Sequence, residues 1–483
     1  MKALFFALVL PGLLSAGDKP NVVFILADDL GYGDVQCLNP QRGKIATPHL
    51  DRLAAQGMTF TDAHSGSSVC TPTRYGLLTG RHAWRTRLQR GVLDGGNDEP
   101  LIAADRLTVA SLLRDHGYAT ACIGKWHLGF QSDAPAARDR GKAAMGKGGL
   151  PVGARILGGP ITRGFEVFFG CSNARTMGSL IEGDRVTESL DNVEVLPRLK
   201  RRAVAWLEER AVQQGKPFFL YLPLTSPHTP IVPSAEWRGT SGLGDYGDFV
   251  RMTDAVVGEV LGALDRLGFT DNTVVFFSSD NGCSPQAGTD SLEKLGHFAS
   301  ERFRGYKADI WEGGHRVPLF VRWPGRIAAG SVQAQPVCLT DFLATCTELL
   351  KVELPAEAGE DSVSFLPTLL GRVGESKPRA LIHHSIDGRF AVREGPWKLC
   401  FCAGSGGWGS PKDKEAETRG LPRLQLYHLD EDPSETRNLV AERPEIVERL
   451  QAVLREAITR GRSTPGYEQV NDVEVRATGL HQL

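Results

Sequence analysis

The sequence has no excess of either charge and no apolar run long enough to cross a bilayer. Lysine and arginine total 55, and aspartate and glutamate total 57, so the formal net charge is only −2. Such a balance lacks the basic surface that nucleic-acid-binding proteins use, so nucleic acid is not an expected partner. With 41% apolar and 23% charged residues, the chain has the composition of an ordinary globular protein.

Residues 1–17, MKALFFALVLPGLLSAG, are typical of an export signal. Lys2 precedes a short apolar stretch that ends in the small residues Ser15, Ala16 and Gly17. This pattern predicts a cleaved signal peptide and a periplasmic or secreted protein without an integral membrane segment. An uncleaved amphiphilic start is the alternative, because only Lys2 supplies the positive flank. The cleavage position lacks a cysteine, so no lipoprotein anchor is expected.

The cysteines show no zinc-ligand spacing, and their number, nine, is odd. An odd thiol in an oxidising compartment requires an explanation, and Cys70 is the candidate. Disulfides among the others remain open, because pairing cannot be deduced from sequence. These others are Cys37, Cys122, Cys171, Cys283, Cys338, Cys346, Cys400 and Cys402.

The length of 483 residues exceeds what one hydrophobic core usually supports, so two domains are expected, 18–377 and 378–483. The first alternates strand-like and helical segments, which predicts an α/β fold with a large mixed, mostly parallel sheet flanked by helices. Its expected strands are 21–27, 118–123, 217–223 and 273–279, and its expected helices are 47–57, 108–116, 201–214 and 254–267. Residues 141–160 and 282–304 lack periodicity and are expected to be surface loops.

The second domain has a different pattern, typical of a small α+β unit. A hairpin over 390–402 and a strand over 424–429 predict a small antiparallel sheet. A final helix over 444–460 carries its apolar residues on one stripe, which indicates that it covers this sheet.

Polar residues follow four of the predicted strands. Ligands of open α/β sheets bind beyond the carboxyl ends of the strands, so these residues are candidates for one site. Aspartate and asparagine oxygens suit a hard cation, Ca²⁺ or less favourably Mg²⁺, better than zinc. Either pair alone is more typical of a turn or helix cap. The residues are Asp28 and Asp29, then Lys125 and His127, then His228, and finally Asp280 and Asn281.

The segment 67–80, SSVCTPTRYGLLTG, carries the most specific motif. Cys70, Pro72 and Arg74 form a C-x-P-x-R pattern, and L-T-G follows at the end of a short helical run. This motif resembles the signature of the type I sulfatases of the alkaline phosphatase superfamily. The alternative is a buried or disulfide-bonded cysteine ahead of a proline-started helix.

The resemblance extends over nearly all of the mature chain. Blocks resembling the family's occur in the family's order: DDLGYGD at 28–34, GKWHLG at 124–129, SPHTP at 226–230, SDNG at 279–282 and KADIWEGGHRVP at 307–318. WKL at 397–399 and LYHLD at 426–430 resemble its C-terminal blocks. The resemblance implies an alkaline-phosphatase-like fold and sulfate-ester hydrolysis.

In that family a maturation enzyme oxidises the motif cysteine to formylglycine, which implies this modification at Cys70. The resemblance implies that one hydroxyl of the aldehyde hydrate attacks sulfur and the alcohol leaves. The other hydroxyl then loses its proton, so that sulfate is expelled and the aldehyde is restored. Arg74 would steady the hydrate, Lys125 and Lys307 would bind sulfate oxygens, His127 would act as a base, and His228 would assist the leaving oxygen. The implied metal ligands are Asp28, Asp29, residue 70, Asp280 and Asn281.

Two alternatives to a sulfatase remain at this point. One is a phosphomonoester or phosphonate hydrolase of the same superfamily, which would more naturally carry Ser or Thr at position 70. The other is a glycan-binding relative without turnover. The expected substrate is a sulfated carbohydrate, ahead of aryl sulfates. Candidate contacts to its leaving group are Arg163, His297, Arg302, Arg304, His383 and His384.

Overall fold

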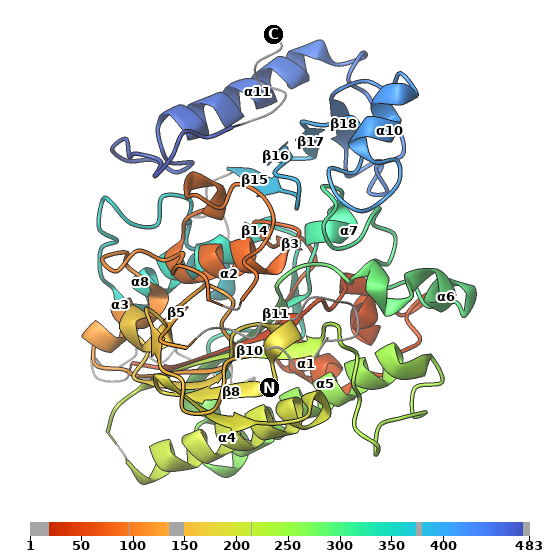
Figure 1. Cartoon of the computed structure of the whole chain (residues 1–483). Coiled ribbons are helices and arrows are strands. Elements are labelled where there is room, and N and C mark those ends of the chain that lie inside the picture. The colour runs from red at the N-terminus through yellow and green to blue at the C-terminus, as the bar shows by residue number, and fades with distance from the viewer. Residues whose placement is uncertain (1–18, 96, 135–148, 214, 373–378, 477–483) are drawn as a thin grey trace, which may run out of the picture.

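The computed structural model describes residues 19–95, 97–134, 149–213, 215–372 and 379–476 (Figure 1). The predicted signal peptide lies outside these residues, and so does the predicted boundary between residues 377 and 378. The division into two domains at that position therefore stays a prediction. In the described part of the chain, no helix is long and apolar enough to span a membrane.

A ten-stranded mixed sheet forms the centre of the molecule. Its strand order is β13-β2-β12-β11-β1-β10-β4-β7-β8-β9. The five strands from β11 to β7 are parallel, and antiparallel strands flank them on both sides. The strands are β1 (Asn21–Asp28), β2 (Met58–Phe60), β4 (Ala119–Lys125), β7 (Val167–Cys171), β8 (Ser179–Glu182), β9 (Arg185–Ser189), β10 (Phe218–Pro227), β11 (Thr273–Ser279), β12 (Leu319–Arg322) and β13 (Ser331–Gln333).

Helices cover both faces of this sheet, which explains why its central strands are apolar throughout. Every residue of β1 is buried, and alternate side chains enter different cores. Val22 and Phe24 pack with α2 (Cys70–Thr79), α3 (Val109–Asp115) and α8 (Phe342–Leu350). Val23 and Ile25 pack with α1 (Pro48–Gln56), α4 (Asn192–Val212) and α5 (Gly244–Arg266). This architecture confirms the predicted alkaline-phosphatase-like fold class.

A separate four-stranded antiparallel sheet, in the order β15-β16-β17-β18, forms the core of the C-terminal part. Its strands are β15 (Ala380–His384), β16 (Phe390–Glu394), β17 (Trp397–Cys400) and β18 (Gln425–His428). Helix α11 (Pro444–Thr459) lies across it, far from α4 and α5 (Figure 1). Leu450 and Leu454 of α11 are fully buried against Phe390, Val392 and Leu399, so the helix covers this sheet as its apolar stripe predicted.

Smaller elements connect these layers. Two short strand pairs combine β3 (Ala63–His64) with β14 (Val337–Cys338) and β5 (Gln131–Ser132) with β6 (Ile156–Leu157). The short helices are α6 (Thr289–Lys294), α7 (Glu312–His315), α9 (Leu366–Leu369) and α10 (Asp413–Thr418). All nine cysteines lie among the described residues as free thiols, so the pairings that the sequence left open are not formed there.

Four predicted boundaries or segments were wrong. Helix α4 begins at Asn192 rather than at 201, although Pro197 interrupts its hydrogen-bond ladder, because Leu196 and Leu199 are buried. Helix α5 begins at Gly244 rather than at 254, because burial of Phe249 outweighs the poor helix propensity of its glycines. The segment 282–304 is not wholly a loop, since it contains α6. The described part of 141–160 contains β6.

Candidate active site

The polar residues predicted to meet at one sheet edge do meet there. Asp28 ends β1, Lys125 ends β4, and Asp280 follows β11 directly. Since β11, β1, β10 and β4 are adjacent and parallel, their carboxyl ends lie side by side. Cys70 reaches the same place from the first residue of α2.

Asp28 and Lys125 form the first ion pair of the site. The Nζ atom of Lys125 lies 2.7 Å from Oδ2 of Asp28, and both side chains are almost completely buried. The Nη2 atom of Arg74 lies 3.5 Å from the other oxygen, Oδ1. Burial alone would raise the pKa of Asp28, but Lys125, His228 and Arg74 hold it well below its usual range. Asp28 is therefore a carboxylate at neutral pH.

Arg74 also holds the carboxylate of Asp280, the second aspartate of the centre. Its Nε and Nη2 atoms both donate to Oδ2 of Asp280, at 3.0 and 2.7 Å, and Nη1 donates to the carbonyl of Lys125 at 2.9 Å. Burial and the neighbouring charge of Asp28 nevertheless raise the pKa of Asp280 to about 6. The two aspartates repel each other, and Arg74 and Lys125 oppose this repulsion.

Asp29 connects the second lysine to the site. Its backbone has a φ of 67°, a left-handed conformation that is uncommon outside glycine, and its amide donates to Oδ1 of Asp280 at 3.2 Å. The Nζ atom of Lys307 lies 2.6 Å from Oδ1 of Asp29. Nε2 of His228 lies 3.6 Å from Oδ2, and Nδ2 of Asn281 donates to Oδ1 at 2.8 Å.

The oxygen atoms of this centre fit a hard cation. Oδ1 of Asp28 and Oδ1 of Asn281 are both buried and accept no hydrogen bond from the described residues. Such acceptors require a partner, and a calcium-type ion supplies one without needing a donor hydrogen. Ligand atoms of Asp28, Asp29 and His228 also lie within 4.8 Å of one another. The residues present therefore fit a divalent metal.

Cys70 lies at the amino end of α2, where unpaired amides favour a negative charge. Only 2% of its surface is exposed. Burial raises the pKa of its thiol, although Lys125 and Lys307 oppose this effect. Because the thiolate is the reactive form of cysteine, the unmodified side chain is a weak nucleophile at neutral pH.

Two histidines flank the centre. Nε2 of His127 lies 2.8 Å from the carbonyl of Leu93, so it carries the hydrogen. Its Nδ1 atom is buried without a hydrogen-bond partner among the described residues and is therefore an available base. Nδ1 of His228 bonds the carbonyl of Thr229, which leaves Nε2 toward Asp29. Burial lowers the pKa of both rings, that of His228 to about 4. Sequence reasoning missed the role of Leu93, because no side-chain pattern marks a backbone carbonyl.

Most of the substrate candidates lie elsewhere, in contacts within the protein. His297 is fully buried, with Nε2 2.8 Å from Asp34 and Nδ1 accepting from the Lys44 amide. His384 is 1% exposed. Arg304 stacks over Trp311 at 3.6 Å and donates to the Glu435 carbonyl. Arg163 is buried and donates to the Ile102 carbonyl. The structure does not bring Arg163, His297 or Arg304 to the centre, and only Arg302 of the six candidates has a largely exposed side chain. His384 lies nearer, because its carbonyl accepts from the amide of Ser68, two residues before Cys70, and its Nε2 atom is buried without a hydrogen-bond partner among the described residues.

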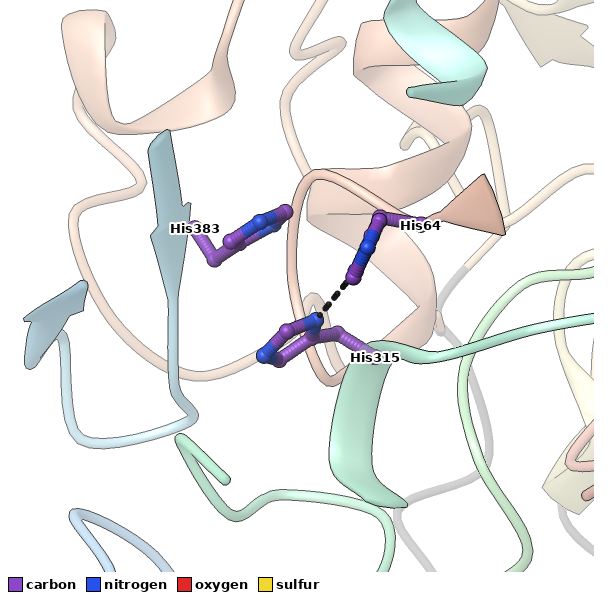
Figure 2. Close-up of side chains that lie close together, drawn as sticks. All are labelled: His64, His315 and His383. Carbon is purple, nitrogen blue, oxygen red and sulfur yellow. Dashed lines mark hydrogen bonds between the residues drawn. The ribbon is translucent and has the colours of Figure 1, made fainter. Parts of the chain in front are cut away.

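The remaining candidate, His383, belongs to a buried cluster with His64 and His315 (Figure 2). The rings of His315 and His383 stack with centroids 4.1 Å apart. Nε2 of His64 bonds Asp62 at 2.6 Å, so its Nδ1 accepts from Nδ1 of His315 at 3.0 Å. His383 donates from Nδ1 to the carbonyl of Ser65. It therefore supports the loop before Cys70 rather than facing a substrate.

This histidine cluster is a weak candidate for a metal centre. Nζ of Lys398 lies 3.0 Å from Nε2 of His315, and Nη1 of Arg393 lies 3.0 Å from Nε2 of His64. A divalent cation would face both charges and would break the bond between the two rings. Burial lowers the pKa of all three histidines, that of His64 to about 4, which favours neutral rings. Nε2 of His383 is buried without a hydrogen-bond partner among the described residues.

The fold and the centre together define an alkaline-phosphatase-like hydrolase whose centre pairs Arg74, Lys125 and Lys307 with three aspartates. The sulfatase family model matches residues 20–352, and the chain belongs to the sulfatase family. It is a sulfatase enzyme of the arylsulfatase-like type, and its family acts on sulfate esters.

Relatives match along nearly the whole chain. The N-acetylgalactosamine-6-O-sulfatase of Bacteroides thetaiotaomicron is 32% identical, covering 92% of this chain and 94% of that protein. Arylsulfatase A of Bos taurus is 34% identical, covering 94% and 90%. A solved structure from work on glycosaminoglycan metabolism by Bacteroides thetaiotaomicron superimposes with a TM-score of 0.79 at 30% identity, covering 91% of this chain and 99% of that one.

Proposed function

We propose that this protein releases inorganic sulfate from sulfated carbohydrates, using a formylglycine made from Cys70 and a bound Ca²⁺. The observation that carries the proposal is the pair of buried oxygens on Asp28 and Asn281 that accept no hydrogen bond from the described residues, beside the amino end of the helix that begins at Cys70. A hydrated aldehyde at this position would supply the attacking hydroxyl that the buried thiol does not provide.

The metal would be held by oxygens of Asp28, Asp29, Asp280 and Asn281, with residue 70 completing the set. A bound divalent cation polarises the nucleophile and the sulfate oxygens. It also offsets the repulsion between Asp28 and Asp280. Ca²⁺ suits this set better than Mg²⁺, because four protein side chains exceed what Mg²⁺ commonly accepts.

Four cationic or basic side chains would bind the ester and transfer protons. Lys125 and Lys307 would bind sulfate oxygens, because their ammonium groups are already fixed by Asp28 and Asp29. His127 would take a proton through its unpartnered Nδ1 atom. Nε2 of His228 would serve the leaving oxygen, and the nearby anionic ester would favour its protonated form.

The substrate is proposed to contain N-acetylgalactosamine 6-sulfate. The 32% identical relative from Bacteroides thetaiotaomicron carries that substrate in its name, and it matches this chain nearly end to end. We also propose that the protein is exported, as its first residues indicate, and that it meets a formylglycine-generating enzyme during biosynthesis.

Two measurements test the function together. Mass spectrometry of the tryptic peptide containing residue 70 would detect the aldehyde, and ion chromatography would detect sulfate released from N-acetylgalactosamine 6-sulfate with and without chelator. We expect turnover only from modified, metal-loaded protein. Turnover by a Cys70→Ala variant would overturn the role of residue 70.

The superfamily alternatives make different predictions. A phosphomonoester or phosphonate hydrolase would cleave phenyl phosphonate esters faster than the matching sulfate ester. A silent glycan-binding protein would bind the sulfated sugar equally well with and without the Cys70→Ala substitution, and neither form would release sulfate. The charge set around residue 70 favours turnover, since a binding protein has no need for an unpartnered base at His127.

A further inference from the structure

A basic groove opens beside the active centre. Its volume is about 1070 Å³. Three separate segments build it, 87–90, 387–389 and 473–476, and four arginines line it against two acids. The lining is Arg87, Gln89, Arg90, Asp387, Gly388, Arg389, Val473, Glu474 and Arg476.

The walls of the groove are held together by specific contacts. The amide of Gly91 donates to the carbonyl of Ile386 at 2.7 Å. Gly388 has a φ of 74°, and a Cβ atom at this position would lie 2.5 Å from the carbonyl of Gln89. The side chain of Gln89 bonds the Glu474 carbonyl and accepts from the Arg476 amide. The groove is therefore a built feature of the fold.

Two of the four arginines have no hydrogen bond or ion pair among the described residues, although the charge of Arg90 acts on Asp387 in the same groove. Arg87 donates to the carbonyls of Glu99 and Pro100, and Arg389 pairs with Asp413 at 2.6 Å. Arg90 and Arg476 are exposed, and their side chains form no hydrogen bond or ion pair with the residues that the structure describes. Free guanidinium groups in a groove are suited to sulfate and carboxylate, which accept paired N–H donors.

Two of the three segments, 87–90 and 387–389, continue along the chain to residues that contact the active centre. Leu93, three residues after Arg90, donates from its amide to Thr71 and accepts at its carbonyl from His127. A chain of three residues spans at most about 11 Å, so the backbone of Arg90 lies within about that distance of Leu93, whose carbonyl holds His127. On the other wall, Ile386 donates to the carbonyl of Ala308, the neighbour of Lys307.

We infer that this groove binds a second anionic group of the substrate, a sulfate or a carboxylate, on a sugar next to the one whose sulfate reaches residue 70. The inference rests on the proposed function and adds a substrate class to it: a polyanionic oligosaccharide, which the groove binds more tightly than a single sulfated sugar. Arg90 and Arg476 are the contacts. They determine specificity and take no part in the bond-breaking step.

Calorimetric binding to Cys70→Ala protein tests the groove without any turnover. The ligands are a chondroitin 6-sulfate tetrasaccharide, its carboxyl-reduced form, and N-acetylgalactosamine 6-sulfate. We expect Arg90→Gln and Arg476→Gln each to weaken tetrasaccharide binding about fivefold, with a smaller effect at high salt. Binding of the monosaccharide should not change. Arg455→Gln, an exposed arginine on α11, is the matched control.

The carboxyl-reduced ligand identifies the anion. If it binds equally to all variants, the groove recognises carboxylate, and if it keeps the fivefold dependence on Arg90, the groove recognises sulfate. Equal binding of the intact tetrasaccharide by the parent and both variants would overturn the proposal that the groove binds a second anion. The same conclusion would follow if the substitutions weakened binding of the tetrasaccharide and of the monosaccharide equally. Failure of the matured protein to release sulfate would instead overturn the proposed function, because the binding result does not depend on turnover.

Discussion

Arg74 donates two hydrogen bonds to a single carboxylate oxygen of Asp280, from Nε at 3.0 Å and from Nη2 at 2.7 Å. Both side chains are fully buried. The guanidinium group also lies 3.5 Å from Asp28, so one arginine keeps two aspartates side by side at the ends of neighbouring strands. A lysine could not make both of these bonds, because its ammonium group lacks the planar fork of arginine.

Arg74→Ala should destabilise the metal-free protein by about 3 to 5 kcal/mol, since it leaves Asp280 buried and unpaired. Urea unfolding in the presence of chelator measures this change. Arg74→Lys should be affected less, because it retains the charge. As a control, Arg114→Ala removes an exposed pair with Asp115 and should cost about 1 kcal/mol or less. Equal effects at positions 74 and 114 would contradict the assigned role of the buried pair.

Removal of the metal should lower both activity and thermal stability. A ligand that binds only the folded state raises stability, so added Ca²⁺ should raise the melting temperature of chelator-treated protein. Asn281→Ala removes one of the two unpartnered oxygens and should reduce this rise. Asn272→Ala, an exposed position, should leave the rise intact. An unchanged calcium response in Asn281→Ala would contradict the ligand set.

The effect of losing His228 should depend on the leaving group. His228→Ala should lower kcat for a carbohydrate sulfate by about 10²- to 10⁴-fold, because an alkoxide leaves poorly without a proton. For a nitrophenyl sulfate the loss should be smaller, since a nitrophenolate leaves without protonation. Steady-state kinetics on both substrates measure the difference, with His116→Ala as the control. Equal losses on the two substrates would assign His228 a role other than assisting the leaving oxygen.

Stability in acid should depend on Asp361. This carboxylate accepts from Arg85 at 2.7 and 2.8 Å, from the His82 amide and from Ser463. Burial would raise its pKa, but Arg85 and His82 hold the pKa well below its usual range. The carboxylate therefore stabilises the fold at every pH above its unfolded pKa of about 3.9, and this contribution is lost as the pH falls below that value.

This pH dependence can be tested with the Asp361→Asn variant. It should be less stable than the parent by about 3 to 5 kcal/mol at pH 7, and the difference should narrow below about pH 4. Urea unfolding at pH 7, 5 and 3.5 provides the comparison, and Asp271→Asn, at an exposed position, is the control. A difference that widens in acid would contradict the assignment.

Helix α11 should contribute to stability through its buried stripe. Leu454→Ala should destabilise the protein by about 2 to 5 kcal/mol, because the side chain is fully buried against the small sheet. Leu421→Ala, where the side chain is 41% exposed, should change stability by less than about 0.5 kcal/mol. Urea unfolding measures both. Activity per folded molecule should stay constant, since the apolar stripe of α11 packs on the small sheet rather than on the centre.

The strands that carry the centre were predictable because each follows a local rule. Residues 21–27 and 273–279 are continuous apolar runs, and burial on both faces of a parallel sheet requires such runs. The starts of α4 and α5 were not predictable in this way. Glycine and proline near those starts weaken local helix propensity, and only packing against the sheet overcomes this cost.

The sequence by itself determined the type of chemistry. The motifs themselves contain the aspartates, Asn281, the lysines and Cys70, and these motifs resemble those of one family. The tertiary structure decided which polar residues share a space. It brought Lys307 to Asp29, withdrew His297 and His383 into buried hydrogen-bond networks, and left Arg90 exposed in the groove beside the centre. Histidine and arginine serve as core groups and as ligand contacts alike, and only burial and the partners within hydrogen-bond reach distinguish the two uses.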